Sequence, residues 1–197
     1  MEKVKAVITG VGGYVPEYIL TNEELARMVD TNDEWITTRV GIKERRILKE
    51  EGLGSSYLAR KAAKQLIQKT GVDPQTIDCV ICATTTSDYR FPSNASIVIG
   101  KLGLTNAHGF DVSCACCGFL YTVDMASTFI ESGRYKRVMV IAAEKMSSIV
   151  DYQDRQTCVL FGGGAAAVML EATTEGGVGF QDSLLRTNGI GVPYLDM

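Results

Sequence analysis

Short apolar runs alternate with helix-like patterns along most of this 197-residue chain, and this alternation limits the folds open to it. Strands are expected at 79–83, 109–113, 137–143 and 165–170, and helices at 55–70, 93–102 and 116–132. The run Val138–Ile141 is wholly apolar, which is typical of a strand buried on both faces. The alternation predicts a layered α/β fold, with helices around a mixed, largely parallel sheet.

The N-terminal region adds a strand and two helix starts. Val4–Thr9 reads as a buried strand, and the cluster Gly10–Gly13 follows it. The third glycine of a dinucleotide-binding turn is replaced by Val15 and no helix opens there, so we expect the glycines to form a loop. The capping patterns Thr21–Glu24 and Thr31–Glu34 each predict the start of a helix.

Composition excludes several classes of function. Twenty Lys and Arg against 23 Asp and Glu give a net charge of -3, which provides no electrostatic argument for nucleic acid or an anionic membrane. No apolar run approaches the length of a membrane span and the N-terminus does not read as a signal peptide, so we expect a cytoplasmic protein. Cys79 and Cys82 should point to opposite faces of a strand, so we expect reduced thiols and no metal site.

Cys116 is the candidate nucleophile. It lies between the strand-like run 109–113 and an apolar helix pattern, where unpaired N–H groups and the helix dipole stabilise a thiolate suited to acyl transfer. A structural cysteine is the alternative, and periodicity does not separate Cys116 from Cys114 and Cys117. The single histidine, His108, begins the same strand and should lie far from Cys116, so we do not expect a Cys-His dyad.

Trp35 and Arg39 form a second candidate site. Their spacing places them on one face of a helix. An indole beside a guanidinium can contact a purine and its phosphates, which suits coenzyme A. The alternative is a core tryptophan with Arg39 lying over it. By themselves, Arg45–Arg46 and Arg155 indicate only a solvated surface.

Together these motifs resemble a known family. Asp111–Phe119 is similar to the active-site signature of the β-ketoacyl-acyl carrier protein synthases III, and Asp30–Arg46 is similar to their coenzyme A-binding segment. Phe91–Ser93 and Asp154–Gly162 match further family patterns. The resemblance implies the N-terminal half of a thiolase-like fold. Residues 1–175 would form that half, and residues 176–197 would begin the connection to a missing second half.

The resemblance also implies an activity, an acyltransferase of fatty acid synthesis initiation. Cys116 would take an acyl group from acyl-coenzyme A, and decarboxylative condensation with malonyl-acyl carrier protein would then give a 3-oxoacyl product. Phe91 would border the acyl pocket near a dimer partner, and Phe161 would lie near the thiol. No cofactor is implied, since acyl-coenzyme A is a substrate. The implied partners are acyl carrier protein and a second copy of the chain.

The nucleotide of coenzyme A would be bound by four residues carried over by position. Trp35 and Arg155 would flank the adenine. Thr31 and Arg39 would lie near the nucleotide and its phosphates.

The chain departs from the family in three respects. The catalytic His and Asn of the family come from the second half and are not found here. Gly163 stands where relatives carry Asp, and Cys114 and Cys117 replace small residues beside the nucleophile. A non-catalytic remnant that binds acyl-coenzyme A or dimerises is therefore the alternative function. A thiolase or polyketide-type synthase fits the Trp35 segment less well.

Overall fold

The computed structural model describes residues 4–194, and its centre is a five-stranded sheet in the order β1-β7-β6-β4-β5. The strands are β1 (Lys5–Tyr14), β4 (Cys79–Ala83), β5 (His108–Val112), β6 (Arg137–Lys145) and β7 (Gly163–Thr173). β4 pairs in parallel with β5 and β6, whereas β7 is antiparallel to both β6 and β1. Only β7 therefore runs against the other strands, which confirms the mixed, largely parallel sheet.

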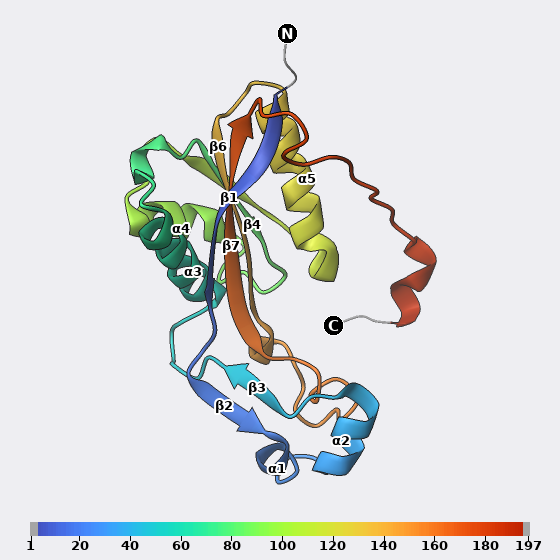
Figure 1. Ribbon diagram of the computed structural model, residues 1–197. Coiled ribbons are helices and arrows are strands. Elements are labelled where there is room, and N and C mark those ends of the chain that lie inside the picture. Colours follow the sequence, from blue (N-terminus) through green and yellow to red (C-terminus); the bar gives the residue numbers. More distant parts are fainter. Residues whose placement is uncertain (1–3, 195–197) are drawn as a thin grey trace.

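Helices cover both faces of this sheet (Figure 1). α3 (Ser55–Thr70) and α4 (Asn94–Leu102) lie on one face, and α5 (Gly118–Glu131) lies on the other. β6 is buried from Val138 to Ile141, as its sequence predicts. Cys82 packs in the core under α3 and α4, and Cys79 packs in the core under α5, so the two thiols face opposite ways as expected. None of the helices described is long and apolar enough to cross a membrane.

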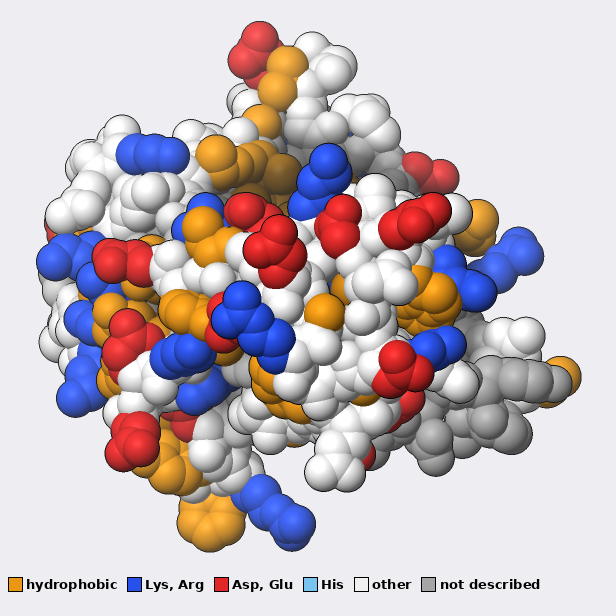
Figure 2. Space-filling model, turned by 90° about the horizontal axis from the view of Figure 1, so that it is seen from below, with side chains coloured by type: hydrophobic (Ala, Val, Ile, Leu, Met, Phe, Trp, Pro, Cys, Tyr) orange, Lys and Arg blue, Asp and Glu red, His pale blue; other side chains and the backbone are white. Residues whose placement is uncertain are grey.

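A smaller lobe lies at one end of the sheet (Figure 1). It contains β2 (Tyr18–Thr21), α1 (Asn22–Leu25), α2 (Asp33–Val40) and β3 (Glu44–Ile47), with β2 and β3 paired antiparallel. The short 3₁₀ turns of the chain are η1 (Pro74–Thr76), η2 (Ala115–Cys117), η3 (Met146–Ser148) and η4 (Gly189–Tyr194). Seen from below in Figure 2, basic and acidic side chains are intermingled over this end of the molecule, in keeping with the near-neutral charge balance.

The predicted helix starts are confirmed, with one shift. Thr21 caps α1 by accepting a hydrogen bond from the Glu24 amide at 3.2 Å. α2 is capped by Asn32 and not by Thr31, since Asn32 Oδ1 accepts from the Trp35 amide at 2.8 Å. Asn is as good an N-cap as Thr, so the sequence pattern fixes the cap only to within one residue.

The glycine cluster does not form a loop, so that prediction is wrong. Gly10, Gly12 and Gly13 lie within β1, after a bulge that follows Ile8. A Cβ on Gly12 would lie 2.4 Å from the carbonyl oxygen of Ala62 in α3. The glycine is therefore required by the close approach of α3 to the strand.

α5 is buried on one side only, although most of its side chains are apolar. Val123, Ala126 and Ile130 face the sheet, whereas Leu120 is 59% exposed. The segment 174–188 runs beside α5 without regular structure, and the Tyr121 and Thr187 hydroxyl groups lie 3.1 Å apart. This extended segment covers less of the helix than a packed layer would.

Arg45 is buried, which corrects the prediction of a solvated Arg45–Arg46 pair. Its Nε and Nη2 donate to the carbonyl oxygen of Val159 at 2.8 and 2.6 Å, and its Nη1 donates to Asn22 Oδ1 at 2.6 Å. The guanidinium thus joins β3 to α1 and to the loop after β6. Arg46, in contrast, remains partly exposed.

Replacing Arg45 with Met should lower the free energy of unfolding by roughly 2–4 kcal/mol, because the Val159 and Asn22 oxygens lose a charged donor in a buried site. The matched variant Arg46→Met should cost less than about 1 kcal/mol. Urea unfolding followed by the fluorescence of Trp35 measures both. Equal effects of the two substitutions would contradict the structural role of Arg45.

Candidate active site

Cys116 lies in the 3₁₀ turn η2, between the end of β5 and the start of α5. The α-helix begins at Gly118, two residues later than its sequence pattern predicts. The backbone is tight here, since Ala115 has a φ of 45° and the Cys117 amide donates to the Cys114 carbonyl at 3.2 Å. Cys116 is exposed, so a thiol is presented at the N-terminal approach to a helix, as expected.

Cys116 lines a hollow of about 340 Å³. Most of its other walls are small side chains from the ends of β4, β6 and β7. The lining residues besides Cys116 are Ala83, Ala115, Phe119, Ala142, Ala143, Glu144, Gly164, Ala165 and Ala166. The arrangement offers a nucleophile, apolar walls and one carboxylate in a single cavity.

Glu144 is a site residue that sequence analysis missed. Its Oε1 accepts from the Thr85 amide at 2.7 Å, and its Oε2 accepts from the Thr86 amide at 3.0 Å. The hydroxyl groups of Thr84, Thr85 and Thr86 donate to the same carboxylate. Glu144 therefore holds the turn that follows β4. The available signal was an acidic residue directly after the apolar run of β6, at the carboxyl edge of a parallel sheet.

Two further carboxylates fix the loops around this edge. Asp111 accepts from the amides of Asn94 and Ala95 at 2.7 and 2.9 Å, which ties the end of β5 to the first turn of α4. Asp88 accepts from the Ser56 amide at 3.0 Å and from the Ser55 hydroxyl at 3.3 Å, at the start of α3. Carboxylates at helix N-termini are favoured by the unpaired amides there. The loops beside η2 are therefore held by charged hydrogen bonds.

Cys79, Cys82 and Cys158 are buried thiols, in contrast to the exposed Cys116. Burial raises the pKa of Cys79 to about 12, and burial also raises the pKa of Cys82 and of Cys158. All six cysteines are free thiols. No cluster of three or more His, Cys, Asp or Glu side chains suited to a metal ion occurs within residues 4–194.

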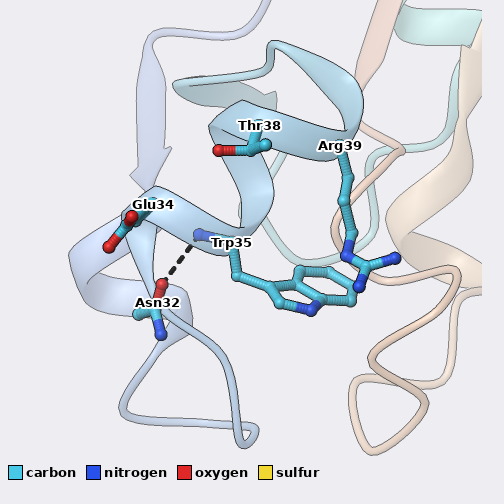
Figure 3. A pocket seen from close by; sticks show the side chains of 5 residues that line it. All are labelled: Asn32, Glu34, Trp35, Thr38 and Arg39. Atoms are coloured by element: carbon cyan, nitrogen blue, oxygen red, sulfur yellow. Dashed lines mark hydrogen bonds between the residues drawn. The ribbon is translucent and has the colours of Figure 1, made fainter.

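Trp35 and Arg39 lie together on α2, as their spacing predicts (Figure 3). The Arg39 guanidinium carbon is 4.6 Å from the centroid of the indole ring. Together with Asn32, Glu34 and Thr38 they line a surface pocket of about 380 Å³. Trp35 is only partly buried, so it is not solely a core anchor.

Arg155 reaches the same indole from the loop after β6. Its guanidinium carbon is 4.7 Å from the centroid of the Trp35 ring, and its Nη1 donates to the Asp30 carbonyl at 3.0 Å. The structure thus unites two arginines separated by 116 positions in the sequence, Arg39 and Arg155, on one aromatic ring. Thr31 lies one residue from Asp30, and its hydroxyl is buried without a hydrogen-bond partner among the described residues.

Other residues singled out from the sequence do not line the hollow beside Cys116. Phe91 is 86% exposed, and neither Phe91 nor Phe161 lines the hollow. His108 is exposed at the start of β5, where its ring lies against Tyr135, so no Cys-His dyad forms. Gly163 begins β7, and a Cβ there would lie 3.3 Å from the Glu144 carbonyl oxygen.

Glu144→Gln should lower the free energy of unfolding by about 1–3 kcal/mol, because an amide nitrogen cannot accept from the Thr84–Thr86 donors. The amides of Thr85 and Thr86 should exchange with deuterium faster than in the wild-type chain. Glu175→Gln, at an exposed position, is the matched control and should change neither quantity. Unchanged exchange at Thr85 and Thr86 would refute the assignment.

Comparisons with known proteins place the chain beside one group of enzymes. Residues 110–189 match the family model described as 3-oxoacyl-[acyl-carrier-protein (ACP)] synthase III. A β-ketoacyl-[acyl-carrier-protein] synthase III of Bacteroides thetaiotaomicron is 66% identical over 197 residues, which is 100% of this chain and 58% of the relative. The chain thus spans less than two thirds of that relative's length.

Solved structures agree with this match. The synthase III of Thermus thermophilus superposes with a TM-score of 0.90 at 38% identity, covering 95% of this chain and 57% of that one. The synthase III of Aquifex aeolicus superposes with a TM-score of 0.83 at 49% identity, covering 86% of this chain and 55% of that one. The fold is therefore the thiolase-like one implied by the sequence motifs. Over the part that it spans, the chain matches members of the 3-oxoacyl-[acyl-carrier-protein] synthase III family.

Proposed function

We propose that this chain carries the acylation step of a fatty acid-initiating condensing enzyme. The single observation that carries the proposal is the exposed Cys116 thiol in a small-walled hollow at the entry to α5. The thiolate attacks the carbonyl carbon of acyl-coenzyme A, and the coenzyme A thiolate leaves. Backbone N–H groups at the start of a helix suit the oxyanion that forms in between.

Trp35, Arg39 and Arg155 bind the nucleotide of coenzyme A in this proposal. The indole offers a stacking surface, and the two guanidinium groups offer charge to phosphates. Insertion of adenine between Trp35 and Arg155 requires the guanidinium to move off the ring that it now contacts. The unpartnered hydroxyl of Thr31 supplies a further polar group nearby.

The complete reaction is proposed for the longer protein that the relatives represent. Condensation with malonyl-acyl carrier protein would release carbon dioxide and yield 3-oxoacyl-acyl carrier protein, with His and Asn supplied by a second half beyond residues 176–197. Phe91, almost fully exposed, would meet a second copy of the chain in a homodimer and border the acyl pocket, while Phe161 would approach the thiol. Six free thiols favour the cytoplasm as the place of action.

Cys116→Ala should abolish covalent acylation when the chain is incubated with a series of acyl-coenzyme A thioesters of increasing chain length. Intact-protein mass spectrometry measures the acyl adduct. Cys117→Ala removes the adjacent exposed thiol and is the matched control, which should still be acylated. An adduct that persists in Cys116→Ala, or its absence from the wild-type chain, would refute the proposal.

Trp35→Ala should weaken coenzyme A binding about tenfold, which corresponds to about 1.4 kcal/mol. Isothermal titration calorimetry with coenzyme A measures this, and Tyr89→Ala, an exposed aromatic outside the pocket, should leave the affinity unchanged. Unaltered affinity in Trp35→Ala would place the nucleotide elsewhere.

A non-catalytic remnant of the fold is the second candidate function, favoured by Gly163 at a position where the family resemblance implies an Asp. The acylation experiment and the coenzyme A titration together distinguish the acylating enzyme from the non-catalytic remnant. Coenzyme A binding that depends on Trp35, without any acyl adduct on Cys116, would favour the remnant.

A further inference from the structure

Three thiols lie within the four residues Cys114–Cys117, at η2 and the residue before it, and a single nucleophile explains only one of them. Cys116 and Cys117 are exposed, and Cys114 is partly buried. Of the three, only Cys116 lines the hollow. Cys114 and Cys117 therefore lie beside Cys116 in the sequence but do not line the hollow.

The backbone brings Cys114 and Cys117 together. The hydrogen bond from the Cys117 amide to the Cys114 carbonyl closes a turn of four residues, which keeps their Cα atoms within about 7 Å. A disulfide needs Cα atoms about 4.4–6.8 Å apart, and a turn closed in this way brings two residues close to that separation.

The sequence around the pair has the pattern of a reactive dithiol. Cys114-Ala115-Cys116-Cys117 is a C-x-x-C directly before a helix. Thiol–disulfide exchange proceeds by attack of a thiolate on a disulfide sulfur, so an accessible neighbouring thiol is the group that such a reaction needs. In contrast to the buried C-x-x-C of β4, this pair has one exposed member to meet a solute.

We propose that Cys114 and Cys117 form a dithiol–disulfide pair that returns an oxidised Cys116 to its free thiol. The oxidant is a low-molecular-weight disulfide such as glutathione disulfide. The Cys116 thiolate attacks one of its sulfur atoms, the S–S bond breaks, and one glutathione thiolate leaves and takes up the proton lost by Cys116.

Two exchanges within the turn then restore Cys116. The Cys117 thiolate attacks the glutathione sulfur, which moves the glutathione to Cys117 and releases the Cys116 thiolate. The Cys114 thiolate attacks the Cys117 sulfur, which forms the Cys114–Cys117 bond and releases the second glutathione. The pair loses two electrons and two protons, and one glutathione disulfide becomes two glutathione thiols.

The test treats the 197-residue chain with glutathione disulfide, quenches free thiols with iodoacetamide, and locates every modification by tandem mass spectrometry. The wild-type chain should lose the mass of two hydrogen atoms through a Cys114–Cys117 bond, with Cys116 alkylated. Cys114→Ser/Cys117→Ser should instead retain one glutathione on Cys116. Wild-type chain that retains glutathione on Cys116 to the same extent would overturn the proposal.

Two single-site variants test which two cysteines form the disulfide. Cys116→Ser should still form the Cys114–Cys117 bond, and Cys114→Ser should retain glutathione on Cys117. An internal disulfide in Cys114→Ser would assign the bond to Cys116 and overturn the pairing. None of these readouts depends on acyl transfer, so failure of the acylation experiment leaves this result unaffected.

Discussion

The parallel alignment of β5, β4 and β6 is the constraint on which the site depends. Ala83 at the end of β4 pairs with Val112 of β5 and with Ala142 of β6, so the three strands end at one edge. Three parts of the site therefore meet at this edge: the turn after β4, the thiol-bearing turn after β5, and Glu144 at the end of β6. The pairing of the strands places them there, and long flexible loops are not required. Reversing any one of these strands would place its terminal residues at the opposite end of the sheet.

Patterned elements of the sequence were predicted well because their signals are local. Periodicity and a left-handed glycine cap at Gly71 define the α3 helix, and the order strand, turn, helix locates the turn that contains Cys116. The Trp35–Arg39 contact follows from helical spacing. In each case neighbours in sequence are neighbours in space, so no tertiary knowledge was needed.

Elements that depend on distant partners were not predictable in the same way. β2 and β3 are four residues each, and β3 reads Glu-Arg-Arg-Ile, so the strand exists because of its pairing and not because of its pattern. Arg45 is buried only because Val159 and Asn22 offer oxygens there, 114 and 23 positions away. Arg155 likewise contacts the indole of Trp35, which lies far away in the sequence, so no rule of local spacing predicts this contact.

The glycine contact in β1 has a consequence for how such chains can diversify. Where Gly12 meets the backbone of α3, the distance between strand and helix is fixed by main-chain atoms, and side-chain substitution cannot widen it without displacing a whole layer. Alanines from three strands line the hollow beside Cys116, and each could be replaced by a slightly larger side chain that extends into the hollow. Larger side chains are therefore easier to accommodate around the hollow than between β1 and α3, where main-chain atoms set the spacing.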